Sequence, residues 1–268
     1  MSVDACAKLV QRGDPDRFAV AMCATGQARA DLFVLFAFNL EVARAPWVTA
    51  EPMIAEMRLQ WWADALGEIG GTGPVRRHEV VTPLADVVAR CGIAPGLLEH
   101  MIAARRFDVY RDPPQGADAL DDYIRDTAGG LARAAAQILG AARDDLFADA
   151  GFGLGAGNLL RAVPELAARG RKPLPLAGLS QQALMNGELD DVACGVVADL
   201  VARADAALGR ARAGRIARVH RPAVLTGWRG LQALRVARRD PMALFAAASE
   251  PSLRERTSFW TAYLTGRW

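Results

Sequence analysis

Lysine is nearly absent from this chain of 268 residues. It occurs only at Lys8 and Lys172, and arginine supplies the remaining basic side chains. Acidic residues almost balance these bases, so the net charge is only +2. A chain so close to neutral is not attracted to nucleic acid by its overall charge. We therefore expect no nucleic-acid partner, and we attribute the preference for arginine to genomic base composition.

Cysteine is also scarce, and its positions argue against both a zinc-stabilised and a disulfide-stabilised domain. The four cysteines, Cys6, Cys23, Cys91 and Cys194, are widely separated and form no C-x-x-C pair. This spacing indicates neither a zinc site nor a disulfide framework. The first residues, MSVDACAKLVQRGD, lack the basic-then-apolar order of a secretory signal. A reduced, cytoplasmic setting is the expectation.

Long hydrophobic runs are missing as well. The run Leu32–Phe38 contains only seven residues, whereas a membrane-spanning helix needs roughly 20. Any association with a membrane is therefore expected to be peripheral. Stretches that alternate apolar and polar residues are too short to predict a strand.

Helical periodicity, in contrast, runs through most of the sequence. Alanine, leucine and arginine dominate, and all three favour helices. We expect a single all-α domain of about ten helices that occupies residues 1–268, with a core at about 15–260. A kink is expected at Pro164, because proline cannot donate a helical hydrogen bond. The longest expected helices are Ala28–Ala43, Glu51–Ile69, Ala119–Leu139, Asp144–Ala168, Leu189–Ala213 and Pro222–Arg238.

The strongest charge asymmetry lies in the segment Arg210–Arg239. Between Ala207 and Arg239 there are nine arginines and no acidic residue. One interpretation is a basic face for an anionic membrane surface or an acidic partner. The other is that these arginines pair with acids elsewhere in the fold, such as Asp144, Asp145 and Asp149. The sequence leaves both open.

Two tryptophans follow one another at Trp61 and Trp62. Neighbouring residues point about 100° apart on a helix. We expect both indoles to pack in the core or at its rim; the alternative is that one fills the core while the other reaches a cavity or surface.

A motif-like run occupies residues 158–175, NLLRAVPELAARGRKPLP. Asn158, Ala162 and Leu166 recur every fourth residue and so share one face of a helix. The run resembles the second metal-binding motif of the squalene/phytoene synthase family, N-x-x-R-D-x-x-E-D-x-x-R-G-R-x-x-x-P. Ala162 and Leu166 occupy the places of its two aspartates. The matching residues are Asn158, Arg161, Glu165, Arg169, Gly170, Arg171 and Pro175.

An earlier run, residues 29–47, resembles the first motif of the same family, an R-x-x-x-x-x-L-Y-A-F run followed by D-D-x-x-D. Arg29 and residues 35–38, LFAF, match it. Ala43, Arg44 and Trp47 stand at the aspartate positions. Because Mg²⁺ needs hard oxygen ligands, and a cation such as Arg44 opposes its binding, neither motif retains its metal ligands.

Further residues are similar to one branch of this family. Asn39, Glu41 and Ala43 form an N-x-E-x-A run, and residues 58–62 read RLQWW. Both features resemble the branch that contains an assembly factor of respiratory complex I. The resemblance implies a helical bundle of the isoprenoid synthase type and a non-catalytic role in complex I assembly. It also implies complex I subunits or assembly intermediates as partners, a peripheral position at the inner face of the inner membrane, and an apolar cavity for an isoprenoid or lipid.

Two other interpretations stay open. The protein could be a prenyltransferase that condenses prenyl diphosphates with Mg²⁺ held by divergent ligands, or a lipid carrier or scaffold unrelated to respiration. Glu41 and Glu165 are the only carboxylates next to the lost aspartate positions, so they form either a one-metal site or structural contacts. We expect no catalytic residue, metal or cofactor. A residual anion or ligand site is expected among Arg29, Asn39, Glu41, Arg58, Asn158, Arg161, Glu165, Arg169 and Arg171.

Overall fold

The computed structural model describes residues 3–110, 112–176, 178–246 and 252–268. In these residues it contains fourteen α-helices, several short 3₁₀ turns and no strand, which confirms the all-α prediction. The helices outnumber the ten expected because some of the predicted segments are divided. None of the helices in the described residues has the length and apolarity to span a membrane.

The contacts within the chain divide it into two compact units. Unit 1 consists of Met1–Tyr110, Gly130–Asp144 and Val219–Thr226, and unit 2 consists of Arg111–Gly129, Asp145–Arg218 and Gly227–Trp268. Each unit is therefore assembled from segments distant in sequence. The prediction of one domain over the whole chain stays a prediction.

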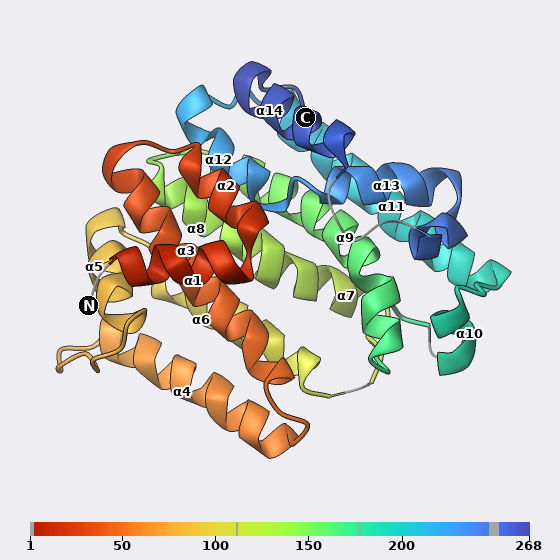
Figure 1. Ribbon diagram of the computed structural model, residues 1–268, viewed down its shortest axis with the longest axis horizontal. Coiled ribbons are helices and arrows are strands. Elements are labelled where there is room, and N and C mark those ends of the chain that lie inside the picture. The colour runs from red at the N-terminus through yellow and green to blue at the C-terminus, as the bar shows by residue number, and fades with distance from the viewer. Residues whose placement is uncertain (1–2, 111, 177, 247–251) are drawn as a thin grey trace. The chain divides into compact units, whose positions relative to one another are not determined.

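Unit 1 is built around α3 (Gly26–Arg44), which carries the first motif. Residues 31–40 of this helix are buried without interruption, so it is covered on all sides. It contacts α1, α2, α5, α6 and α8, and Figure 1 shows α1 crossing it. The other helices of unit 1 are α1 (Val3–Gly13), α2 (Pro15–Met22), α4 (Pro52–Gly70), α5 (Val81–Cys91), α6 (Pro95–Arg105), α8 (Gly130–Ile138) and α12 (Arg221–Val224).

Prolines separate α3 from α4. After α3 ends, Pro46 lies in a 3₁₀ turn, Ala45–Trp47, and Pro52 starts α4 at the position where a missing N–H costs least. On α4, Trp62 is 5% exposed, whereas Trp61 is only partly buried. Trp62 therefore packs in the core, and Trp61 lies at its rim beside the solvent.

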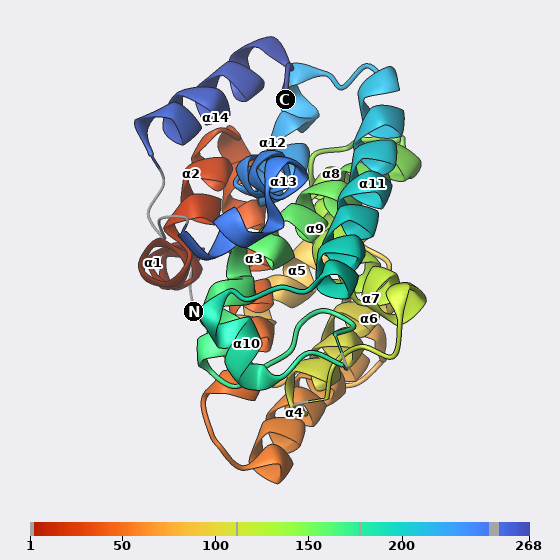
Figure 2. The same ribbon diagram turned by 90° about the vertical axis from the view of Figure 1, so that its right-hand side faces the viewer.

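Unit 2 is organised by α9 (Asp144–Ala168), which carries the second motif and continues through Pro164. Gly153 of α9 lies against Leu208 of α11, and Gly157 lies against Gly230 at the start of α13. Helices α11 and α13 also contact one another (Figure 2). The remaining helices of this unit are α7 (Ala117–Ile124), α10 (Gln181–Asn186), α11 (Asp191–Ala213), α13 (Gly230–Arg239) and α14 (Leu253–Thr265).

Two of the predicted long helices are interrupted. The expected helix Pro222–Arg238 consists of α12, a 3₁₀ turn at Leu225–Gly227, and α13. This break brings Gly227 and Gly230 against α9, where a side chain on either would collide with Leu154. The expected helix Ala119–Leu139 is divided by a π-helical turn at Arg125–Gly129, next to the Gly129–Gly130 pair.

Burial predicts which cysteines will react. Cys6 and Cys23 are 0% and 8% exposed, and desolvation raises the pKa of each thiol to about 11. Because only the thiolate attacks, about one in a thousand of these thiols is reactive near pH 8. We expect a thiol-directed reagent to modify the half-exposed Cys194 first. Peptide mapping by mass spectrometry would measure the order, and equal rates at Cys6 and Cys194 would contradict it.

Candidate functional site

The first motif offers no oxygen ligand at its three aspartate positions. Ala43 presents a methyl group and Trp47 an indole, and Arg44 is turned to the α1 side of α3. A Cβ atom built on Gly13 of α1 would lie 2.5 Å from Nη2 of Arg44, so the guanidinium rests against that glycine. Arg44 therefore takes part in the packing of α1 on α3.

Glu41 is the carboxylate next to these aspartate positions in the sequence, and it faces another way. Two residues on a helix are separated by about 200°, so Glu41 and Ala43 lie on opposite sides of α3. Glu41 lines a groove of about 450 Å³ together with α4 side chains that include Met57, Arg58 and Trp61. We call this the α4 groove; its other lining residues are Ile54, Trp62 and His78.

Aromatic contacts hold the wall of the α4 groove. The rings of Trp61 and Trp62 meet edge to face with centroids 5.1 Å apart, and His78 lies 5.0 Å from Trp61. Arg76 stacks over Trp61 at 4.9 Å and forms a salt bridge of 2.6 Å with Glu68. The backbone N–H, Nε and Nη2 of Arg76 all donate hydrogen bonds to the Glu68 carboxylate, and they lower the pKa of Glu68 to about 2. The Trp61 ring is thereby held by contacts with Trp62, His78 and Arg76.

The charged groups of the α4 groove are not paired with one another. Neither the Glu41 nor the Arg58 side chain has a hydrogen bond or ion pair with the described residues. The groove thus combines apolar walls with one free carboxylate and one free guanidinium. Such a site can bind an amphipathic group by contact and charge, but its lining contains no nucleophile beside a base.

Two other predicted residues of unit 1 lie outside the groove lining. Nε of Arg29 donates to the carbonyl of Ala24 at 2.8 Å, which fixes the turn that precedes α3. Asn39 is 6% exposed within α3. The structure therefore brings Glu41 and Arg58 together, while Arg29 and Asn39 have places in the frame of unit 1.

The second motif belongs to unit 2, and its charged residues are held by local contacts. Arg169 forms a salt bridge of 2.6 Å with Glu165, one helical turn earlier. Nδ2 of Asn158 donates to the carbonyl of Gly227 at 3.3 Å, whereas Oδ1 of Asn158 is buried without a partner among the described residues. Arg161 is half-buried, with its Nε inaccessible.

Gly170 of the second motif allows the chain to turn where α9 ends. Gly170 has a φ of +75°, in the left-handed region, and the N–H of Arg171 donates to the carbonyl of Leu166 at 2.9 Å. This arrangement ends a helix with its last carbonyls satisfied. The R-G-R spacing of the motif thus has a local structural cause that is independent of metal binding.

The side chains of the two motifs do not suit the magnesium ions that such motifs hold. Ala43, Trp47, Ala162 and Leu166 have no oxygen to donate, and Arg44 carries the wrong charge. Glu165 is already paired, and Glu41 points into the α4 groove. In the described residues, no three His, Cys, Asp or Glu side chains cluster closely enough to hold a metal. The absence of a cofactor stays a prediction.

Sequence reasoning missed part of the α4 groove. The four-residue spacing of Met57 and Trp61 was a visible signal, since it places both on one face of α4. His78 and Ile54 carried no such signal, because they reach the groove only through the packing of separate segments. Met57 is 65% exposed and Ile54 48% exposed, which is unusual for apolar side chains beside a tryptophan pair.

Comparison with known sequences gives consistent matches. A model of the family "Squalene/phytoene synthase" matches residues 10–257. The Bos taurus and Homo sapiens proteins named NADH dehydrogenase (ubiquinone) complex I, assembly factor 6, are 27% and 26% identical to the chain over 217 residues. A Drosophila melanogaster homolog of that factor is 28% identical over 205 residues. The alignments cover 77%, 77% and 69% of this chain, and 64%, 64% and 59% of those relatives.

Solved structures show the same architecture. The squalene synthase HpnC from Alicyclobacillus acidocaldarius superposes with a TM-score of 0.70 at 18% identity, over 96% of this chain and 94% of that one. A dehydrosqualene synthase crystallised with a ligand gives a TM-score of 0.76 at 14% identity, over 99% and 97% of the two chains. At these identities the likeness is one of fold, and it confirms the expected isoprenoid synthase bundle.

Proposed function

Because this chain belongs to the squalene/phytoene synthase family, we propose that it is a non-catalytic member that acts in the assembly or maturation of respiratory complex I. The observation that carries the proposal is the replacement of the aspartates in both motifs while the flanking residues are kept. The printed names of the curated relatives, complex I assembly factors, support the same role. The chain spans about 64% of the length of the Bos taurus and Homo sapiens relatives. We therefore do not assign every activity of those longer proteins to it.

The proposed partners are subunits or assembly intermediates of complex I, met at the inner face of the inner membrane. Support comes from the start of α4, where Met53, Ile54 and Met57 are 75%, 48% and 65% exposed. Adjacent exposed apolar side chains are typical of surfaces that contact another protein. The apolar wall of the α4 groove also suits an isoprenoid or lipid tail, which we include in the proposal as a ligand.

Deletion of the gene in its own host tests this function. We expect complex I to decrease severely in native gels, and NADH-dependent quinone reduction to fall with it, because an assembly factor acts before the mature complex exists. Succinate-dependent quinone reduction serves as the control and is expected to stay unchanged. Expression of the intact chain from a plasmid is expected to restore complex I.

The same strain separates the alternatives. A variant with Glu41→Gln and Glu165→Gln removes the two carboxylates next to the lost aspartate positions, and we expect it to restore complex I as a non-catalytic factor would. Normal complex I in the deletion strain would overturn the assembly role and favour a carrier or scaffold unrelated to respiration.

A further inference from the structure

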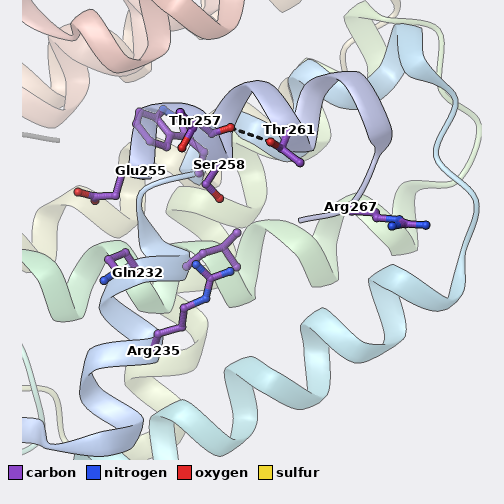
Figure 3. A pocket seen from close by; sticks show the side chains of 9 residues that line it. Gln232, Arg235, Glu255, Thr257, Ser258, Thr261 and Arg267 are labelled. Atoms are coloured by element: carbon purple, nitrogen blue, oxygen red, sulfur yellow. Dashed lines mark hydrogen bonds between the residues drawn. The ribbon is translucent and has the colours of Figure 1, made fainter. Parts of the chain in front are cut away.

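Two adjoining cavities in unit 2 share Arg235 in their linings. Arg235 belongs to the arginine-rich segment Arg210–Arg239, which we call the basic segment. The first, of about 360 Å³, lies between α13 and α14 and is lined by Trp228, Leu231, Arg235 and Ser258 among others (Figure 3). The second, of about 420 Å³, is lined by Leu231, Arg235, Arg212 and Arg238 among others. Both share Leu231 and Arg235. We call the pair of cavities the arginine pocket; no residue of either family motif lines it.

Positive charge exceeds negative charge in this pocket. Its lining includes the arginines Arg212, Arg235, Arg238 and Arg267 but only the acids Asp205 and Glu255. Both acids have other partners. Asp205 accepts hydrogen bonds of 2.5 Å and 2.6 Å from Nη2 of Arg238. Glu255 accepts from Ser252 in the capping box that starts α14 and lies 3.9 Å from Arg229.

Among the described residues, Arg235 is an unpaired cation of the lining that both cavities share. Its side chain makes no hydrogen bond or ion pair with the residues that the structure describes, and Figure 3 shows it rising from α13 toward Ser258 of α14. Arg212 is exposed, its Nε donates to the carbonyl of Trp268 at 2.7 Å, and its guanidinium stacks on the Trp268 ring at 5.1 Å. Desolvation lowers the pKa of Arg212, and the positive charges of Arg235 and Arg238 lower it further.

Neutral donors complete the lining around Arg235. The hydroxyl of Ser258 has no hydrogen-bond partner in the described part of the chain, and Nε1 of Trp228 is buried there without an acceptor. A buried donor without an acceptor costs about 1–3 kcal/mol. By contrast, Thr261 is already engaged, since its hydroxyl donates to the carbonyl of Thr257 at 2.9 Å. The unused groups of the lining therefore include the Arg235 guanidinium, the Ser258 hydroxyl and the indole N–H of Trp228.

We propose that the arginine pocket binds a phosphate group, with Arg235 and Ser258 as its central donors. A guanidinium binds phosphate through paired, charge-assisted hydrogen bonds, and the hydroxyl and indole N–H suit the remaining oxygens. Either cavity is large enough for a phosphate together with the group that bears it. The phosphate can belong to a soluble molecule or to the headgroup of an anionic lipid. The assignment does not depend on a role in complex I.

Calorimetric titration of the whole chain with inorganic phosphate and glycerol phosphate at low ionic strength tests the soluble source. We expect Arg235→Gln to weaken binding about tenfold or more, because a charge-assisted bond is lost. Ser258→Ala is expected to weaken it about threefold without any change of charge. The matched control is Arg239→Gln, which removes an exposed arginine from the same helix but outside both cavities, and should change affinity less than about twofold.

Sedimentation with vesicles tests the lipid source. Vesicles of phosphatidylcholine, with or without phosphatidic acid, are mixed with the intact protein and the same variants. Loss of binding in Arg235→Gln and its retention in Arg239→Gln supports the pocket in either arm, and the arm that responds identifies the source. Absence of binding in both arms, or an equal loss in these two variants, overturns the proposal. Unchanged circular dichroism melting of Arg235→Gln confirms that the variant is folded.

Discussion

Replacing Gly157 with valine is expected to destabilise the protein by about 3 kcal/mol or more. A Cβ atom at Gly157 would lie 2.2 Å from the carbonyl oxygen and 2.7 Å from the Cα atom of Gly230. A side chain on Gly230 would also collide with α9, because its Cβ atom would lie 2.2 Å from the carbonyl oxygen of Leu154. Both obstacles are backbone atoms, which cannot move aside as the end of a flexible side chain can. Denaturant unfolding followed by circular dichroism measures the change.

The control for this substitution is Gly195→Ala in α11 of the same unit. Gly195 is exposed within the helix, and no heavy atom would lie within 4 Å of its added Cβ. Alanine there is expected to stabilise the protein by about 0.5–1 kcal/mol, because it restricts the unfolded chain and favours the helix. An unchanged unfolding midpoint for Gly157→Val would mean that α9 and α13 do not approach as closely as the structure has them.

Incubation with farnesyl or geranylgeranyl diphosphate and Mg²⁺ is expected to release no diphosphate. Departure of diphosphate without metal loses charge stabilisation of several kcal/mol, so the rate should be lower than that of a synthase with its aspartates by about a thousandfold or more. Of the two carboxylates beside the motifs, Glu165 is paired with Arg169 at 2.6 Å and Glu41 lines the α4 groove. A phosphate-release assay measures turnover, with an active squalene synthase as the positive control.

Two variants make this assay decisive. Glu41→Gln and Glu165→Gln each remove one carboxylate while they keep the size of the side chain. If the protein does release diphosphate and either substitution abolishes the release, the non-catalytic assignment is wrong and a divergent prenyltransferase replaces it. Release that neither substitution changes would point to a contaminating enzyme.

The basic segment shows how far charge patterns could be interpreted before the fold was known. Nine arginines without an acid left open whether they form a basic face or structural pairs. The structure shows structural pairs, and the basic face stays a prediction. Arg210 pairs with Asp149 at 2.5 Å, one of the acids named from sequence, whereas Arg238 pairs with Asp205, which was not. Arg235 is left free and lines the arginine pocket. These pairs join residues tens of positions apart, so no local pattern encodes them.

The sequence by itself determined the all-α class, the positions of most helices, the family and the loss of the metal ligands. Periodicity, proline positions and glycine at a helix end act over a few residues, and a missing carboxylate is missing in any fold. Only the tertiary structure decided that Glu41 turns into the α4 groove, that Gly157 meets Gly230, and that Arg235 and Ser258 face one cavity. Each of these depends on which segments pack together, and packing is set by the whole set of buried contacts rather than by neighbours in the chain.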